Sequence, residues 1–182
     1  MLQKLKSWFA PDPLDAPARA LYHRIVEQAR RPEFFDAFAV PDTANGRFDM
    51  IVLHCYCVMR RLKKSPEGYD LSQMLATVLV DDLDRNLREM GVGDLSVGKK
   101  VKRIAEGFYG RLDAYDAAFE ETEDEALSEA LRRNIYSSLD DPPTDGVAAM
   151  VSYFRREVAA VDEVDLERLA LGEVTFGAPT FS

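Results

Sequence analysis

The chain has 182 residues, of which 47% are hydrophobic and 30% are charged, a composition typical of one globular domain with a single core. Its formal net charge of -9 at pH 7 argues against general nucleic-acid binding, because a phosphate backbone would repel it. The sequence has no apolar run approaching the ~18 residues of a membrane span and no signal-peptide core. Only one residue separates the two cysteines, Cys55 and Cys57, which disfavours a disulfide between them and indicates a reducing compartment. We therefore expect a cytoplasmic protein.

Residues 1–17 are expected to form a short amphipathic arm. Apolar side chains recur at helical spacing from Leu2 to Phe9, and three prolines between residues 11 and 17 then interrupt the pattern. Aromatic side chains beside lysines suit a weak contact with a membrane interface, and a frayed terminus is an equal alternative. The candidate membrane-contact residues are Lys4, Lys6, Trp8 and Phe9.

Residues 18–171 are expected to form one helical domain. Apolar positions recur at helical spacing from residue 18 to about Arg30, and Pro32 then opens a short second helix that carries three phenylalanines. Residues 41–47 contain Asn45-Gly46, which predicts a turn.

The next segment, residues 48–63, is apolar on nearly every side, which is typical of a helix in the middle of a bundle. A buried strand is the alternative, but the length of the segment favours a helix. Asp70 with Gln73 resembles a capping box, which predicts a second helix to about residue 90. Gly91 and Gly93 are expected to end that helix in the left-handed conformation.

Residues 97–119 carry the clearest amphipathic stripe of the chain, with charges on the opposite face. Thr122 with Glu125 predicts a cap for a further helix through residue 135, and residues 147–161 mark a last long helix. The tail, residues 172–182, is expected to be flexible. The fold class predicted from these elements is all-α, an irregular single-domain bundle of about six or seven helices.

Residues 93–99 reproduce the G-x-x-x-x-G-K spacing of a phosphate-binding loop. The next residue is Lys100, where that motif needs Ser or Thr, and the preceding segment DRNLREM is polar, where the motif needs a buried strand. We interpret these glycines as a corner between two helices.

Asp81, Asp82 and Asp84 are candidate magnesium ligands of the kind that isoprenoid enzymes use. On a helix these three positions do not share one face, and no second acidic helix repeats the pattern. We favour a solvated face with ion pairs from Asp81 to Arg85 and from Asp84 to Arg88.

His54, Cys55 and Cys57 are candidate metal ligands, but side chains at i, i+1 and i+3 of a helix do not converge. We expect two buried thiols and one hydrogen-bonded histidine instead. The only other histidine is His23, so no Ser/His/Asp or Cys/His nucleophile set can be assembled. The sequence therefore predicts no catalytic residue, no metal site and no cofactor.

Positive charge is concentrated between residues 84 and 111. This stretch has seven basic and four acidic residues, a charge of +3, so the rest of the chain carries -12. Four of the bases lie in the first two turns of a predicted helix, where the macrodipole disfavours cations, so local stability does not explain them. We expect a surface that binds an anionic partner; ordinary solubilising charge is the alternative. The candidate partner-binding residues are Arg85, Arg88, Asp94, Lys99, Lys100, Lys102, Arg103 and Arg111.

The same stretch carries a family resemblance. Residues 84–95, DRNLREMGVGDL, followed by residues 97–102, VGKKVK, resemble the signature of the ubiquinol-cytochrome c chaperone family. Further blocks agree in the same order: ALY at 20–22, PDT at 41–43, GRFDM at 46–50 and FYGR at 108–111. The resemblance spans about residues 18–160, and the chain is similar to the bacterial type of the family, which lacks the targeting extension of the mitochondrial type.

This resemblance implies a helical, non-enzymatic assembly factor for respiratory complex III. Members of the family bind newly made cytochrome b, which for a bacterial chain implies a peripheral position on the cytoplasmic side of the inner membrane. Anionic lipid headgroups are a further partner that a basic surface could take. Two other functions stay open: an all-helical magnesium-dependent isoprenoid or lipid enzyme that uses the three aspartates, and a general helical adaptor.

Overall fold

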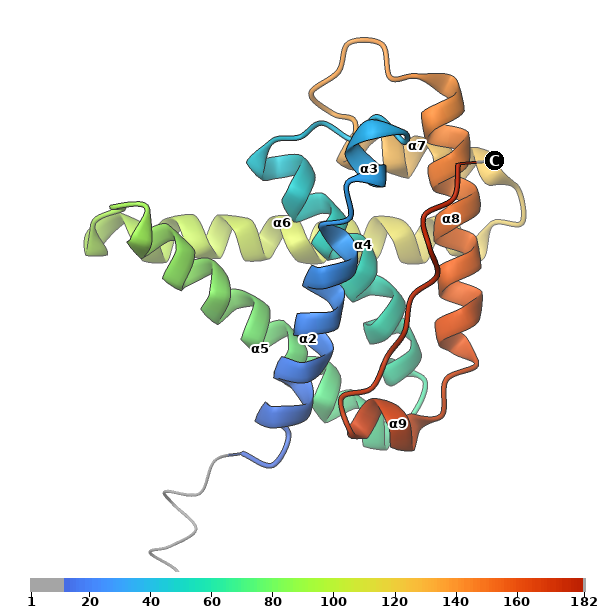
Figure 1. Cartoon of the computed structure of the whole chain (residues 1–182). Helices are drawn as coiled ribbons and strands as arrows, with labels where there is room; N and C mark the ends of the chain where they lie inside the picture. The colour runs from blue at the N-terminus through green and yellow to red at the C-terminus, as the bar shows by residue number, and fades with distance from the viewer. Residues whose placement is uncertain (1–11, 182) are drawn as a thin grey trace, which may run out of the picture.

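The computed structural model describes residues 12–181, apart from the side chains of residues 94 and 95. Within this range the chain is all helical, which confirms the predicted fold class (Figure 1). The described range has eight helices, six of them longer than ten residues, against the expected six or seven. The helices are α2 (Asp15–Ala29), α3 (Glu33–Asp36), α4 (Ala44–Lys63), α5 (Pro66–Glu89), α6 (Asp94–Glu120), α7 (Asp124–Asn134), α8 (Thr144–Asp162) and α9 (Leu166–Ala170).

Helix α4 lies at the centre of the bundle because its residues are apolar on almost every side. Met50, Leu53 and Val58 are fully buried, and the helix packs against α2, α5, α6 and α8 (Figure 1). Burying a large apolar side chain of this kind contributes about 1.5 to 3 kcal/mol. On another side of α4, the ring of Tyr56 lies 5.5 Å from the rings of both Tyr115 and Phe154, measured between centroids. This aromatic cluster ties α4 to α6 and α8.

The start of α4 corrects the turn predicted at residues 41–47. Thr43 Oγ1 accepts the Gly46 N–H at 3.1 Å, so the helix begins at Ala44 and includes the Asn45-Gly46 pair in its first turn. A side chain at position 46 would collide with the carbonyl oxygen of Pro41, so glycine is required here for close approach rather than for a turn.

Two further helix starts differ from the predictions. Helix α5 begins at Pro66, because Ser65 Oγ accepts the Gly68 N–H at 3.1 Å and proline suits the first helical position. The predicted cap, Asp70, lies inside the helix. Helix α7 begins after Glu123 with no side-chain cap, so the predicted Thr122 box is not formed. Both predictions chose a cap by its sequence pattern, and in the structure neither pattern forms the cap.

Helices α5 and α6 meet at residues 90–93, and Figure 1 shows this corner lying away from the other helices. Gly91 has a φ of 80°, the left-handed conformation that the sequence predicts. Gly93 has a φ of -63°, so the same prediction is wrong for this residue. Met90 at the corner is 76% exposed.

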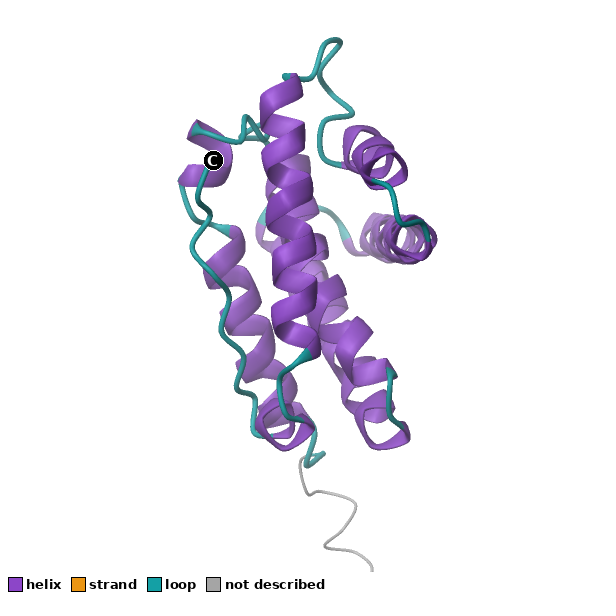
Figure 2. Cartoon of the chain, turned by 90° about the vertical axis from the view of Figure 1, so that its right-hand side faces the viewer, coloured by secondary structure: helices purple, strands orange, loops and turns teal. Residues whose placement is uncertain are grey.

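The segment after α9 lies against the bundle through residues 176 and 177, within the tail that the sequence predicts to be flexible. Figures 1 and 2 show it running back along the bundle as an extended chain beside α2 and α8. Gln28 Nε2 of α2 donates to the Gly177 carbonyl at 2.7 Å, and Glu157 Oε2 of α8 accepts the Gly177 N–H at 2.7 Å. The ring of Phe176 lies 5.0 Å from the His54 ring. Side chains of α2, α4 and α8 therefore contact the C-terminal segment. The sequence of the segment alone does not indicate these contacts.

Candidate functional site

Most of the predicted partner-binding residues lie together on the corner between α5 and α6. We call this surface the basic corner, formed by Arg85, Arg88, Lys99, Lys100, Lys102 and Arg103. All six side chains are exposed. Two of them lie in the last turns of α5 and four near the start of α6, so the six bases flank the corner on its two sides.

The six bases differ in how far their charge is neutralised. Arg88 Nε bonds to Asp84 Oδ2 at 2.6 Å, whereas Lys102 lies 3.8 Å from Glu106 and is 79% exposed. Among the described residues, Lys99, Lys100 and Arg103 have no ion-pair partner. Because α6 begins at Asp94, these three cations lie in its second and third turns, beyond the first turn in which the helix dipole acts on a charge. The corner can therefore bind an anionic partner through charges that the fold itself does not use.

Two other predicted residues do not join the basic corner. Arg111 Nε donates to Asp49 Oδ1 at 2.7 Å, and its side chain is only 24% exposed, so it serves an internal ion pair. Asp94 begins α6, but its side chain lies outside the described part of the chain. Lys4, Lys6, Trp8 and Phe9, the candidate membrane contacts, also lie outside the described residues.

The apparent phosphate-binding loop is a helical corner, as we interpreted it. The segment before Gly93 is the last turn of α5 rather than a strand, and Gly98 lies inside α6. The Ser96 and Val97 amides donate to the Gly93 carbonyl at 2.8 and 3.1 Å, as at an ordinary helix start.

The aspartates of α5 form ion pairs and hydrogen bonds. The predicted pair of Asp84 with Arg88 is confirmed, but Arg85 lies 3.8 Å from Asp82 rather than pairing with Asp81. Asp82 Oδ2 also accepts a hydrogen bond from Tyr22 Oη at 2.9 Å. No three His, Cys, Asp or Glu residues within residues 12–181 are grouped so that they could hold a metal ion.

The histidine and cysteines of α4 lie in the core, as predicted. His54 Nδ1 lies 2.7 Å from the Met50 carbonyl, which only accepts, so Nδ1 carries the proton and Nε2 accepts from the Tyr153 hydroxyl at 2.7 Å. Burial lowers the pKa of His54 to about 4, so the ring is neutral. Burial also raises the pKa of the Cys55 and Cys57 thiols, which leaves both unreactive.

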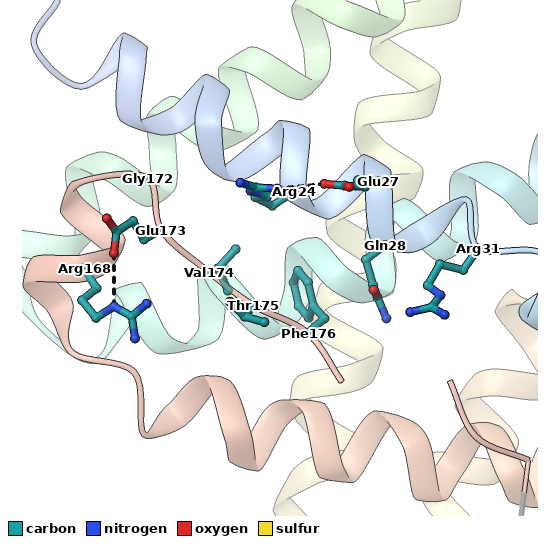
Figure 3. Close-up of a pocket in the computed structure, with 10 residues that line it drawn as sticks. All are labelled: Arg24, Glu27, Gln28, Arg31, Arg168, Gly172, Glu173, Val174, Thr175 and Phe176. Carbon is teal, nitrogen blue, oxygen red and sulfur yellow. Dashed lines mark hydrogen bonds and ion pairs between the residues drawn. The ribbon is translucent and has the colours of Figure 1, made fainter. Parts of the chain in front are cut away.

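A cavity of about 650 Å³ lies between α2 and the C-terminal segment (Figure 3). Its lining includes Arg24, Gln28, Arg31, Arg168, Val174 and Phe176. Each of the three arginines already has a carboxylate partner, Glu27 at 3.1 Å, Glu33 at 2.7 Å and Glu173 at 3.2 Å respectively. The cavity has therefore little uncompensated charge with which to bind an anion.

A smaller cleft lies between α2 and α5, and none of the sequence predictions included it. Arg19, His23 and Arg30 of α2 line it together with Arg85 of α5. The signal was present in the sequence, because positions 19, 23, 26 and 30 share one face of a helix and three of them are basic or titratable.

None of the described helices is both long enough and apolar enough to span a membrane.

Comparisons with known proteins identify the family and the fold. The family described as ubiquinol-cytochrome C chaperone matches residues 36–176, which include both helices of the basic corner. The crystal structure of the Cbp3 homolog from Brucella abortus is similar in fold, with a TM-score of 0.81 and 34% sequence identity over 98% of this chain and 96% of that one.

Curated relatives carry the name ubiquinol-cytochrome c reductase complex assembly factor 1. The Xenopus laevis protein is 28% identical over 161 residues, which are 87% of this chain and 80% of the relative. The human protein is 27% identical over 161 residues, and the chain spans about half of its length, 53%. Because the family match covers most of the chain, the chain belongs to the ubiquinol-cytochrome c chaperone family.

Proposed function

We propose that this protein takes part in the assembly of ubiquinol-cytochrome c reductase as a non-enzymatic chaperone. The proposal rests on the family, whose description is that of a chaperone, and on relatives named as assembly factors of this complex. The client we propose is newly made cytochrome b, held at the cytoplasmic surface of the inner membrane.

The observation that carries the proposal is the unpaired charge of the basic corner. Lys99, Lys100 and Arg103 are exposed and have no ion-pair partner in the described part of the chain, although the chain as a whole is acidic. Cytoplasmic segments of a membrane protein lie beside anionic headgroups, which attract each nearby Lys or Arg by about 1 kcal/mol. The basic corner would therefore orient the acidic chaperone toward its client, with the acidic remainder of the surface directed away from the membrane.

The experiment compares two double charge reversals. One is Lys99→Glu with Lys100→Glu in the basic corner; the other is Lys63→Glu with Arg133→Glu, two exposed bases on α4 and α7 that also have no ion-pair partner among the described residues. Both change the net charge equally. Each variant is purified from membranes by affinity, and cytochrome b is quantified in the eluate by mass spectrometry.

We expect the corner variant to lose cytochrome b and the assembled reductase to decrease, while the control variant retains both. Circular dichroism and thermal melting should match the wild type in both variants, because the substituted side chains are exposed. Equal retention of cytochrome b by the two variants would remove the basic corner from the function. Absence of cytochrome b from the wild-type eluate would overturn the choice of client.

A further inference from the structure

The cleft between α2 and α5 is lined by an unusual number of cations for an acidic chain. We call it the α2–α5 cleft; its volume is about 310 Å³, at the small end of the roughly 300 to 1,000 Å³ range of small-molecule sites. Its polar lining residues are Arg19, Tyr22, His23 and Arg30 of α2 with Asp82 and Arg85 of α5. Three guanidinium groups and one imidazole thus surround a single carboxylate.

That carboxylate already accepts two hydrogen bonds and has one guanidinium nearby. Asp82 Oδ2 accepts from Tyr22 Oη at 2.9 Å and from Asn86 Nδ2 at 3.1 Å, and Asp82 Oδ1 lies 3.8 Å from Arg85. The Tyr22 bond also joins α2 to α5 and fixes one wall of the cleft. Asp82 therefore has little capacity left to neutralise the other cations.

Of the remaining bases, one guanidinium is free to bind a ligand. Arg19 Nε donates to Asp15 Oδ2 at 2.8 Å, whereas the Arg30 side chain has no hydrogen-bond or ion-pair partner among the described residues. Arg30 lies at the C-terminal end of α2, where the helix dipole favours a cation, but the dipole does not account for Arg19 in the first turns of the same helix. The Asp15 pair accounts for Arg19, whereas the Arg30 guanidinium keeps its donors available for a ligand.

We propose that the α2–α5 cleft is a binding site for a phosphate-class anion, held by Arg30 and Arg85 with support from Arg19 and His23. Guanidinium forks match the geometry of phosphate oxygens, and two of them on facing helices can bind one such group from both sides. A free phosphate ester and the phosphate of a lipid headgroup share this chemistry. Arg85 belongs to both the cleft and the basic corner, whereas Arg30 belongs to the cleft alone, so Arg30→Gln tests this proposal separately from the assembly role.

The test uses the purified full-length chain and isothermal titration calorimetry with glycerol phosphate. Binding to vesicles of phosphatidylcholine, with and without phosphatidylglycerol, is measured in parallel by sedimentation. The variants are Arg30→Gln and Arg85→Gln. The matched control is Arg24→Gln, which also removes an exposed arginine of α2 but does not line this cleft.

Saturable binding of glycerol phosphate is expected, and each cleft variant should weaken it about tenfold or more, since a charge-assisted hydrogen bond is lost. Arg24→Gln should leave the affinity unchanged. Binding of phosphatidylglycerol vesicles alone, if lost in Arg30→Gln, would support the site and identify a lipid headgroup as its ligand. Absence of both kinds of binding in the wild type, or equal binding by Arg30→Gln and Arg24→Gln, would overturn the proposal.

A substitution with the opposite sign separates binding from structural damage. Asp82→Asn keeps an acceptor for the Tyr22 hydroxyl but removes the negative charge from the cleft, so it should tighten glycerol phosphate binding several-fold. A general loss of fold would weaken binding in every variant. Weaker binding in Asp82→Asn, with thermal melting unchanged, would contradict an electrostatic site.

Discussion

Arg111 of α6 donates through Nε to Asp49 Oδ1 of α4 at 2.7 Å, inside the bundle, where the Asp49 side chain is only 3% exposed. Burial raises the pKa of Asp49 to about 6, and the Arg111 guanidinium opposes that rise. Arg111 also donates to the Gly107 carbonyl at 3.0 Å and lies over the Phe48 ring. An arginine whose spacing suggests a surface role thus holds two helices together.

Arg111→Gln is therefore expected to destabilise the fold by about 2 kcal/mol, because it leaves a buried carboxylate without its cation. Arg103→Gln, an exposed base of the same helix, should change the free energy of unfolding by less than about 0.5 kcal/mol. Urea denaturation followed by circular dichroism measures both values. Equal effects of the two substitutions would show that the Arg111 contact with Asp49 contributes nothing.

The helical class and most helix positions could be predicted because they follow from local periodicity. The near-continuous apolar segment of α4 indicated the central helix, and the stripe of α6 indicated one buried face. The helix starts were harder, because several capping patterns compete locally. Ser65 rather than Asp70 caps α5, since its hydroxyl accepts the Gly68 N–H.

The candidate site was only partly predictable for a related reason. The clustering of bases around residue 100 is visible in the sequence, but whether each base is free depends on partners that lie far away in the chain. Asp49 is 62 positions from Arg111, and no spacing rule connects them. The α2–α5 cleft likewise needs α5 to lie across the basic face of α2, which periodicity alone does not indicate.

The two glycines of the α5–α6 corner should differ in their response to alanine. Gly91 has a φ of 80°, so Gly91→Ala is expected to cost about 1 kcal/mol of stability. Gly93 has a φ of -63°, which alanine adopts without strain, so Gly93→Ala should lose only the N-cap preference of glycine and cost less than Gly91→Ala. Thermal melting of the two single variants tests this difference. A larger loss in Gly93→Ala would mean that the corner has a different backbone conformation.

The docked C-terminal segment can be tested with two neighbouring residues. Phe176 packs against the His54 ring, so Phe176→Ala should destabilise the fold by about 1 to 2 kcal/mol. The control is Thr175→Ala, because the Thr175 side chain is exposed. This substitution should change the free energy of unfolding by less than about 0.5 kcal/mol. Hydrogen exchange should show protection of the Gly177 amide, which donates to Glu157. If neither substitution changes the stability and the Gly177 amide exchanges fast, the C-terminal segment is a flexible tail.

The buried neutral His54 predicts a pH dependence of stability with a definite sign. Its folded pKa of about 4 lies below its ordinary value of 6.5, so between these values the unfolded chain binds a proton that the folded chain does not. The contribution of His54 is therefore present above about pH 6.5 and is lost as the pH falls toward 4. Asp49, whose folded pKa is raised, changes stability in the opposite direction over a similar range.

A difference measurement isolates the histidine from Asp49. His54→Gln retains a donor and an acceptor for Met50 and Tyr153 but does not titrate, and Asp49 is present in both proteins. Between about pH 7.5 and about pH 4.5, the free energy of unfolding of the wild type should fall by roughly 2 kcal/mol relative to that of the variant. Urea denaturation at a series of pH values measures this difference. If it stays constant with pH, His54 has an ordinary pKa in the folded state and is not enclosed by the Tyr153 and Phe176 rings as the structure places it.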